Sequence, residues 1–414
     1  MAELFRRQGI AQPMQNGEPQ QLIFVNTCAV TRKAAAKSRH AVARLARENP
    51  DAVVIAAGCL PQLDPNSLLK IEGVDYIIGT ADRFSLGWWD GKPDEARVKV
   101  GTPMKVDSVS VAGFQQRSRP FLKIQDGCDH DCTYCIIPRL RGIPRSVPRE
   151  EIVSMLIGLL DAGAYEVVLT GVRIGSWGID LGGGCNFVGL LQELTNIDRS
   201  FRLRLGSIEP WEISPDLINL IFNSAKICSH LHVPIQHTEE RILKRMGRPP
   251  VDEALTLVSA ARAANPDLAL GVDVIAGFPG ETEADFGRLR EALMVLPITY
   301  LHAFGFSARP GTTASEMPDK VEESIIKERV KKLREIGSIK RAEFLKSQIG
   351  RVMEVISQKP GYQDDWVTAV SDNYIKLKIK STDIINGKPL RSELGYDPSI
   401  GYVGVGRSSA ENAR

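Results

Sequence analysis

The sequence predicts an α/β protein with three parts: an amino-terminal parallel α/β unit, a central partial (βα)6 barrel of the TIM type, and a small all-β region at the carboxyl end. Two observations lead to this prediction. Short apolar runs, typical of buried strands, alternate with helical patterns from residue 22 to about residue 310. After residue 350 the pattern changes to short alternating strands separated by turn residues, which is typical of a small barrel or sandwich. The 414 residues suit two or three domains, which we expect at residues 1–112, 113–346 and 347–414.

The amino-terminal unit is expected to contain a parallel sheet, because a helix separates its first two buried strands. The predicted elements are strands at residues 22–26, 52–57 and 75–79 and a helix at residues 31–48. The first two strands run directly into Cys28 and Cys59. Both cysteines therefore follow the carboxyl end of a strand, where open α/β sheets place their binding sites.

A polar stretch at residues 91–118 separates this unit from a longer run of strand and helix patterns. The predicted strands lie at residues 121–125, 166–170, 202–206, 230–235, 270–275 and 301–306. The predicted helices lie at residues 149–162, 188–197, 214–223, 238–246, 252–264 and 282–295. These βα repeats predict a partial TIM-type barrel, whose site lies at the carboxyl ends of its strands. A charged amphipathic helix at residues 319–346 follows, and then strands at residues 352–357, 366–371, 374–380 and 402–405.

The composition excludes several classes of protein. The net charge is +2 and 43% of the residues are hydrophobic, as in an ordinary globular protein. No apolar run approaches the roughly 18–20 residues of a membrane span, and the amino end lacks the apolar segment of a signal peptide, so we expect a cytoplasmic protein without a membrane partner. The seven cysteines are an odd number in a long chain, which argues against a disulfide framework.

Three cysteines form a cluster in a loop that begins with Gly127 and follows a predicted strand; they are Cys128, Cys132 and Cys135. Three thiolates on one short loop can each bind one iron of a [4Fe–4S] cube, which leaves the fourth iron open for a small molecule. The alternative is a structural zinc site with His130 as the fourth ligand. The spacing differs from the paired C-x2-C of such zinc sites, so the iron–sulfur interpretation is favoured.

This C-x3-C-x2-C motif after the first strand of a βα barrel resembles the radical S-adenosylmethionine (SAM) superfamily. The resemblance implies that SAM binds the open iron and that one electron cleaves it to a 5′-deoxyadenosyl radical. Tyr134 occupies the aromatic position that is common in this motif, although packing of the loop explains this residue equally well.

Further segments resemble the methylthiotransferases within that superfamily. They are Asn26-Thr27-Cys28-Ala29-Val30, Gly58-Cys59-Leu60-Pro61, Cys135-Ile136-Ile137-Pro138, Gly277-Phe278-Pro279-Gly280 and Ser307-Ala308-Arg309-Pro310-Gly311. This resemblance implies a flavodoxin-like amino-terminal domain, incomplete here, and a TRAM-like β domain at the carboxyl end. The segments Leu169-Thr170-Gly171 and Ser207-Ile208-Glu209-Pro210 most resemble the branch that acts on N6-threonylcarbamoyladenosine in tRNA.

The resemblance implies that the chain adds a methylthio group to carbon 2 of N6-threonylcarbamoyladenosine at position 37 of tRNA. One SAM methylates a sulfur held at an auxiliary [4Fe–4S] cluster, and another provides the radical that activates the C–H bond. The implied partners are tRNA, an electron donor and a sulfur donor, and we expect a monomer. Two alternatives remain: an enzyme that modifies an aspartate of a ribosomal protein, and a non-thiolating paralogue without the auxiliary cluster.

By the same resemblance, SAM and the substrate contact Tyr134, Thr170, Gly171, Ser207, Glu209 and Gln236, and the auxiliary cluster is bound by Cys28 and Cys59. Ser207 and Glu209 follow a predicted strand and are expected to face the mouth of the barrel. Ordinary capping of a loop is the alternative for both.

The sequence departs from the family at two places. In the family, a third cysteine that binds the auxiliary cluster lies ahead of the first helix. Residues 1–10 of this chain resemble that first helix, so the segment with the third cysteine is missing. Either the start of the sequence has been placed too far downstream, or this cluster ligand has been lost. Cys185 and Cys228 are expected to be incidental. After Gln236 the family has Ser-Gly, where this chain has His237-Thr238, and we expect His237 to face solvent at the start of a helix.

Arginines close to the cysteine loop are candidates for RNA contact. Arg139, Arg141, Arg145 and Arg149 lie in a short segment that contains no acidic residue. Such a patch neutralises phosphates of a nucleic acid.

Overall fold

The computed structural model describes residues 14–15, 18–19, 21–81, 83, 89, 93–103, 118–358, 365–383 and 388–406. The chain divides into two compact units. Unit 1 consists of Met1–Gly113, Asp126–Arg145 and Ser307–Met317, and unit 2 of Phe114–Gln125, Ser146–Phe306 and Pro318–Arg414. The segment at residues 1–10 lies outside the described residues, and the three domain boundaries stay predictions.

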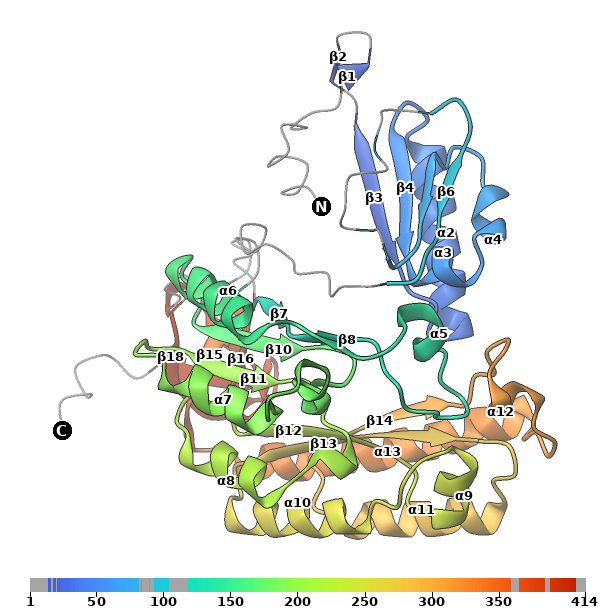
Figure 1. Cartoon of the computed structure of the whole chain (residues 1–414). Coiled ribbons are helices and arrows are strands. Elements are labelled where there is room, and N and C mark those ends of the chain that lie inside the picture. Colours follow the sequence, from blue (N-terminus) through green and yellow to red (C-terminus); the bar gives the residue numbers. More distant parts are fainter. Residues whose placement is uncertain are drawn as a thin grey trace. The chain divides into compact units, whose positions relative to one another are not determined.

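Unit 1 contains a parallel sheet, as predicted, and this sheet has four strands where the sequence predicts three (Figure 1). Its strands are, in spatial order, β3 (Leu22–Thr27), β4 (Val53–Gly58), β5 (Tyr76–Ile78) and β6 (Arg97–Lys99). The sequence does not predict β6, because all three of its residues are exposed and it lacks an apolar run. Two short antiparallel strands, β1 (Met14–Gln15) and β2 (Glu18–Pro19), precede the sheet.

Apolar side chains pack on both faces of β4, which explains why every residue of this strand is buried. On one face, β4 packs against α2 (Arg32–Glu48), with Val54 and Val42 in one apolar cluster. The helix begins where the Thr31 side chain accepts a hydrogen bond from the backbone N–H of Ala34. Two short helices, α3 (Cys59–Leu63) and α4 (Asn66–Leu69), lie between β4 and β5 in the chain.

The cysteine loop belongs to the same unit as this sheet. It lies between two-residue strands that pair with each other, β8 (Gln125–Asp126) and β9 (Arg145–Ser146), and it runs into α5 (Ile137–Arg141). Ile136 and Leu140 are each 1% exposed and join the apolar cluster of α2 and β4. The loop is thus anchored by the core of unit 1.

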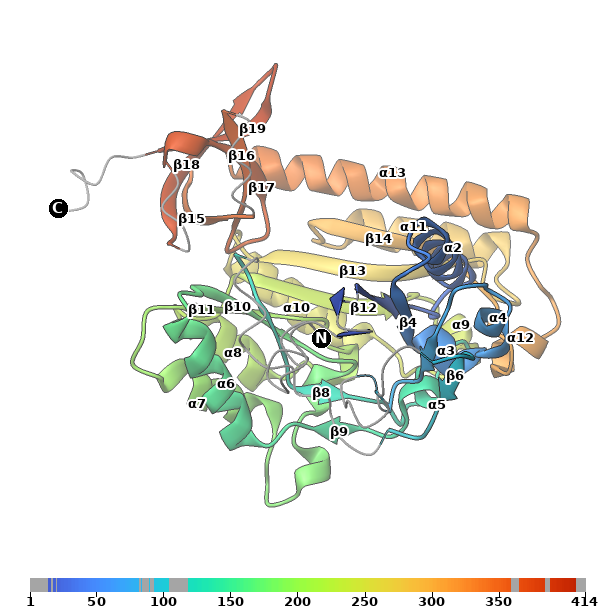
Figure 2. The same ribbon diagram turned by 90° about the horizontal axis from the view of Figure 1, so that it is seen from above.

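Unit 2 contains the predicted partial barrel (Figures 1 and 2). Its parallel strands are β7 (Phe121–Lys123), β10 (Glu166–Thr170), β11 (Arg202–Leu205), β12 (His230–Gln236), β13 (Ala269–Ala276) and β14 (Tyr300–Gly305). A parallel bridge between Ser207 and His232 links the β7–β10–β11 half to the β12–β13–β14 half. The helices between the strands are α6 (Arg149–Asp161), α7 (Phe187–Asn196), α8 (Pro215–Asn223), α9 (Glu240–Arg245), α10 (Asp252–Ala264) and α11 (Glu283–Val295).

The predicted charged helix is α13 (Glu323–Ser347), which packs against β14 (Figure 2). The remaining short helices are α12 (Thr313–Glu316), η2 (Ile174–Ser176), η3 (Ile179–Leu181), η4 (Pro210–Glu212) and η5 (Ser381–Asp383).

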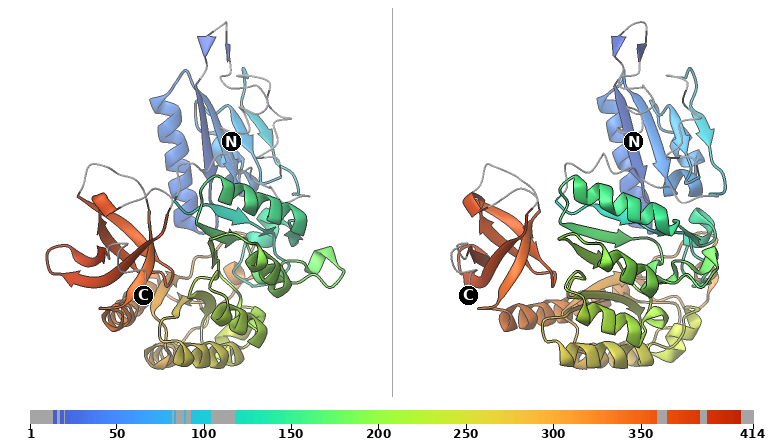
Figure 3. Two further views of the ribbon diagram at one scale, coloured as in Figure 1. Left: turned by 90° about the vertical axis from the view of Figure 1, so that its left-hand side faces the viewer. Right: turned by 60° about the vertical axis from the view of Figure 1, so that its left-hand side comes forward.

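The carboxyl-terminal strands close into a small barrel, drawn in red in Figure 3. Its strands are β15 (Val352–Ser357), β16 (Trp366–Ser371), β17 (Lys376–Lys380), β18 (Leu390–Asp397) and β19 (Gly401–Gly406). The sequence predicts four of these and misses β18, in which Ser392 and Leu394 are the buried residues. One buried apolar side chain in eight residues gives too weak a pattern to predict a strand.

Candidate active site

The cysteine loop turns sharply at Gly127, which has a positive φ of 78°. A Cβ atom at this position would lie 2.0 Å from the carbonyl oxygen of Ile143. Only glycine fits such a close approach of two backbone segments. The backbone N–H of Cys128 donates to the carbonyl of Gly142 at 3.0 Å, and that of Cys135 donates to the carbonyl of Cys132 at 2.9 Å. These contacts fix the shape of the loop.

The three cysteines of the loop are all partly exposed, although the neighbouring Ile136 is buried in the core. The backbone N–H of His130 donates to the Cys128 sulfur at 3.4 Å. Iron-bound thiolates commonly accept such hydrogen bonds. The accessible sulfurs on one rigid loop therefore fit a [4Fe–4S] cluster.

Cys28 and Cys59 lie at neighbouring positions on the carboxyl edge of the unit 1 sheet. The residues before them, Thr27 and Gly58, pair in register on β3 and β4. Cys28 is exposed, and its backbone is held by the Ser38 hydroxyl, which donates to its carbonyl at 3.1 Å and accepts from its N–H at 3.0 Å. Cys59 is buried at the start of α3. The prediction that both follow strand ends is confirmed.

Arg141 connects the cysteine loop with Cys59. Its Nη1 donates to Oδ1 of Asp126 at 3.0 Å, and its Nη2 donates to Sγ of Cys59 at 3.7 Å. Burial opposes the charge of Arg141, but Asp126 and Cys59 outweigh it and raise the pKa of the guanidinium. Arg141 thus stays charged at every physiological pH.

The other candidate arginines also have partners within the protein. Arg139 donates to the Pro310 carbonyl, Arg145 to the Ile143 carbonyl, and Arg149 pairs with Glu150 and Glu193. Arg145 is buried, whereas the side chain of Arg149 is about half exposed at 51%. The prediction that these four residues bind RNA stays a prediction. Arg139 and Arg149 are the exposed members of the group, and the charge of Arg149 is already paired with two glutamates.

Several predicted contact residues lie at the carboxyl ends of the barrel strands. Thr170 ends β10, and the exposed Gly171 follows it. A Cβ on Gly171 would lie 2.8 Å from the carbonyl oxygen of Gln125, so the glycine permits two strand ends to approach. Ser207 follows β11, is exposed, and lines a cavity in unit 2. Tyr134 is partly buried between Cys132 and Cys135.

Glu209 is held by neighbouring side chains. Its Oε2 lies 2.5 Å from Nη2 of the buried Arg248, whose guanidinium lies over the ring of Trp211 at 4.7 Å. Glu209 also precedes η4 and forms a reciprocal capping box with Glu212. Glu209 therefore caps the short helix η4, as the alternative interpretation expects. Its predicted contact with SAM stays a prediction.

The prediction for His237 is wrong. This residue is completely buried rather than solvent-facing. Its Nδ1 accepts a hydrogen bond from the backbone N–H of Glu239 at 2.9 Å. Its Nε2 is buried and has no hydrogen-bond partner among the residues that the structure describes. Burial lowers the pKa of His237 to about 4. The preceding residue, Gln236, has a positive φ of 65°, which turns the chain inward after β12.

Cys228 is buried in unit 2, and burial raises its pKa to about 12. A thiol with such a pKa is a poor metal ligand and nucleophile. Cys185 is partly exposed in the segment before α7.

Sequence reasoning missed a group of polar side chains inside the unit 2 barrel. His232, Asp273 and His302 lie on three neighbouring strands with their ligand atoms within 4.8 Å of one another. One feature of the sequence could have indicated this group: the alternation His230-Leu231-His232 places two imidazoles on one face of a strand. In the described part of the chain, no helix is long and apolar enough to cross a membrane.

Comparisons with known proteins agree with the predicted family and fold. Residues 122–293 match the radical SAM superfamily, and residues 1–79 match a family described as uncharacterized protein family UPF0004. The solved structure of the radical S-adenosylmethionine methyltransferase TsrM from Kitasatospora setae has a TM-score of 0.54 at 16% identity, over 72% of this chain and 65% of that chain. That likeness concerns the fold alone.

Two curated relatives match over most of their length. The threonylcarbamoyladenosine tRNA methylthiotransferase MtaB of Bacillus subtilis (strain 168) is 37% identical, over 89% of this chain and 84% of that protein. The tRNA-2-methylthio-N(6)-dimethylallyladenosine synthase of Carboxydothermus hydrogenoformans is 33% identical, over 83% of this chain and 81% of that protein. The chain therefore belongs to the family of radical SAM tRNA methylthiotransferases and is a transferase.

Proposed function

We propose that this enzyme adds a methylthio group to carbon 2 of N6-threonylcarbamoyladenosine at position 37 of tRNA. The observation that supports this substrate most is the ranking of relatives. Three relatives that are named for threonylcarbamoyladenosine are 35–37% identical and two more are 32% identical, whereas three that are named for dimethylallyladenosine are 30–33% identical.

The radical chemistry requires a [4Fe–4S] cluster and SAM, which the family implies. We assign the cluster to Cys128, Cys132 and Cys135, with SAM at the iron that has no cysteine. When bound, this pair supplies the one-electron chemistry that removes hydrogen from an inert C–H bond. Gly127 lets the loop pass close to the Ile143 carbonyl, and the His130 N–H stabilises negative charge on the Cys128 sulfur.

The residues proposed to hold SAM and the adenosine are Tyr134, Thr170, Gly171, Ser207, Glu209 and Gln236. Hydroxyl groups of Thr170 and Ser207 would accept or donate hydrogen bonds there, while Gly171 permits close approach of a ligand to the backbone. Glu209 would act on a ligand only together with Arg248, because these two side chains are paired.

The sulfur chemistry is assigned to an auxiliary cluster bound by Cys28 and Cys59. Arg141 supports this assignment, because its guanidinium donates to both the Cys59 sulfur and Asp126, the residue that precedes the cysteine loop. A fixed cation near sulfur stabilises anionic ligands. The reaction also consumes electrons and sulfur, so we expect protein or small-molecule donors of both.

Nucleoside analysis of tRNA tests the substrate. In a strain that lacks this gene and has no second copy, 2-methylthio-N6-threonylcarbamoyladenosine should disappear while its precursor without the methylthio group accumulates. The wild-type gene should restore the product, and the Cys132→Ala variant should not. Unchanged product contradicts the proposal. A modified ribosomal-protein aspartate would favour that alternative, and SAM cleavage without any thiolation would favour a non-thiolating paralogue.

A further inference from the structure

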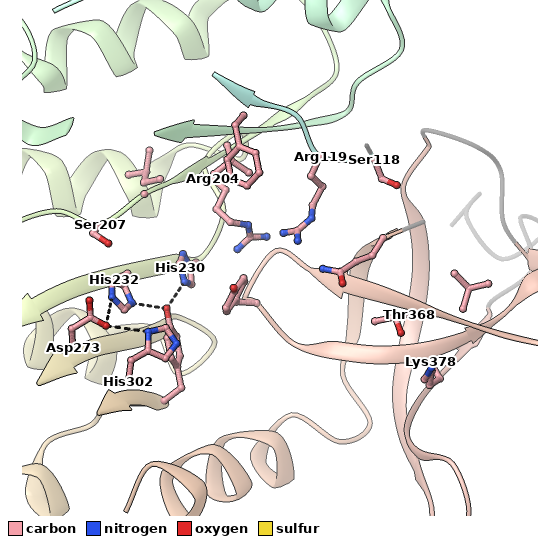
Figure 4. Close-up of a pocket in the computed structure, with 18 of the residues that line it drawn as sticks. Ser118, Arg119, Arg204, Ser207, His230, His232, Asp273, His302, Thr368 and Lys378 are labelled. Atoms are coloured by element: carbon pink, nitrogen blue, oxygen red, sulfur yellow. Dashed lines mark hydrogen bonds and ion pairs between the residues drawn. The ribbon is translucent and has the colours of Figure 1, made fainter. Parts of the chain in front are cut away.

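Three neighbouring strands of the barrel in unit 2 bring two imidazoles and one carboxylate together (Figure 4). His232 lies on β12, Asp273 on β13 and His302 on β14, and Asp273 and His302 pair directly in the register of their strands. Nε2 of His232 and Nδ1 of His302 each lie 3.0 Å from the same oxygen, Oδ1 of Asp273. Their ligand atoms are therefore within reach of a single ion.

Tyr300 holds His232 in the orientation that this cluster needs. Its hydroxyl lies 2.9 Å from Nδ1 of His232, so the other ring nitrogen, Nε2, faces Asp273. The same hydroxyl lies 2.8 Å from Nε2 of His230. A histidine that binds a metal through one nitrogen commonly has its other nitrogen hydrogen-bonded in this way, which fixes the ring and its tautomer.

Charge and exposure also suit a cation. Ring nitrogens of His232 and His302 both point at the same oxygen of Asp273, and an aspartate carboxylate can supply the negative charge that a cation needs. The side chain of His302 is 52% exposed, whereas that of His232 is 9% exposed. His232 is thus held in the protein interior, while His302 leaves the cluster accessible from solvent.

The cluster lines a cavity of about 880 Å³ within unit 2. Figure 4 shows Arg119 and Arg204 on the other side of this cavity. Both arginines donate to the buried Glu166, so part of their charge is already balanced. Open space beside a three-residue ligand set leaves room for water at the remaining coordination positions.

We propose that His232, Asp273 and His302 bind one divalent transition-metal ion. The expected ion is Zn²⁺, and Fe²⁺, which accepts the same kinds of ligand, is the alternative occupant. Two histidines and one carboxylate are a recurrent set for both ions, and both keep positions for oxygen ligands. None of these three residues is a cysteine ligand of the proposed clusters, and the proposal goes beyond the methylthiotransferase reaction.

Zinc binding by the full-length protein tests the proposal. The cysteine sites are first filled by anaerobic reconstitution with iron and sulfide, and the protein is then equilibrated with buffered Zn²⁺. We expect about one zinc per chain by elemental analysis. X-ray absorption at the zinc edge should show nitrogen and oxygen ligands at about 2.0–2.1 Å and no sulfur at about 2.3 Å. Sulfur ligands, or no zinc bound, would overturn the proposal.

Variants identify the ligands. Asp273→Asn and His302→Gln preserve size and polarity, and each should weaken zinc binding at least tenfold. His40→Gln is the matched control, because His40 is exposed on α2 in unit 1, and it should bind zinc as the wild type does. Iron content and circular dichroism show whether each variant is folded. Undiminished zinc binding in both folded variants would mean that the three residues form a hydrogen-bonded group and not a metal site.

Discussion

The ring of Tyr300 occupies the space that a side chain on Gly271 would fill: a Cβ built on Gly271 would lie 1.9 Å from Cζ of Tyr300. The two residues pair in the register of β13 and β14. The missing side chain lets the Tyr300 hydroxyl reach both His230 and His232. The hydrogen bonds in the barrel interior thus depend on a glycine on the neighbouring strand.

Gly271→Ala should destabilise the protein by about 1–3 kcal/mol, because the buried Tyr300 ring must move into a packed interior. The midpoint of denaturant unfolding measures this change. Gly287→Ala is the control, since Gly287 lies in α11 with no atom within 4 Å of the added Cβ. That substitution should leave stability unchanged or increase it by up to about 1 kcal/mol. Equal effects of the two changes would contradict the close contact.

Cys132→Ala should abolish cleavage of SAM, because two thiolates no longer hold a cube with one open iron. The measurement is 5′-deoxyadenosine formed under reducing conditions, which should fall to the level without enzyme. Cys185→Ser provides the comparison, since Cys185 lies outside the cysteine loop on the segment before α7. That variant should cleave SAM at the wild-type rate. Cleavage that persists in Cys132→Ala would refute the assigned cluster.

Arg141→Ala should lower methylthiolation by about tenfold to a hundredfold, the usual effect of removing a residue that supports metal ligands. The reason is the loss of the contacts to Asp126 and Cys59. Arg141→Lys should not restore activity fully, because an ammonium cannot reach two partners as a planar guanidinium does. Arg149→Ala, at an exposed ion pair, should keep the iron content of the wild type.

The same variants separate a supporting role of Arg141 from a contact with RNA. If Arg141 instead bound a phosphate, its loss would reduce the slope of log affinity for tRNA against log salt concentration by about one. Because Asp126 and Cys59 already accept hydrogen bonds from this guanidinium, we expect an unchanged slope and a reduced iron or sulfide content for Arg141→Ala. That result would leave Arg139, Arg145 and Arg149 as the candidates for RNA contact.

His237 should make the stability depend on pH. Its pKa is about 4 in the folded chain, as burial lowers it, whereas that of an unfolded chain is about 6.5. Below about pH 6.5 the unfolded state binds a proton that the folded state does not, so stability falls as the pH decreases. Between pH 7.5 and 5.5 this loss amounts to about 1 kcal/mol.

The comparison of wild type with His237→Ser isolates this contribution. Between pH 7.5 and 5.5, the free energy of unfolding should decrease by about 1 kcal/mol less in the variant than in the wild type. Identical pH profiles would indicate a histidine that is exposed to solvent in the folded state.

The sequence predicts the strands and helices of the barrel well, because buried strands such as β10 are continuous apolar runs and helices such as α10 bury residues at helical spacing. It misses β6 and β18, whose exposed or polar residues show little pattern. The buried position of His237 could not be predicted, since it depends on the left-handed conformation of Gln236, a residue for which that conformation is uncommon. The group of His232, Asp273 and His302 depends on the register of three strands, which a single sequence does not specify.

The anchoring of Ile136 and Leu140 in the core of unit 1 has a consequence for dissecting this enzyme. The barrel strands and the cysteine loop follow one another in the chain, yet the loop shares its apolar core with α2 and β4. A fragment that begins at the barrel would expose these two side chains to water and lose the support on which the loop is folded. The barrel sequence is therefore not a self-sufficient module, because the amino-terminal sheet and α2 provide the apolar core on which a loop encoded far downstream is packed.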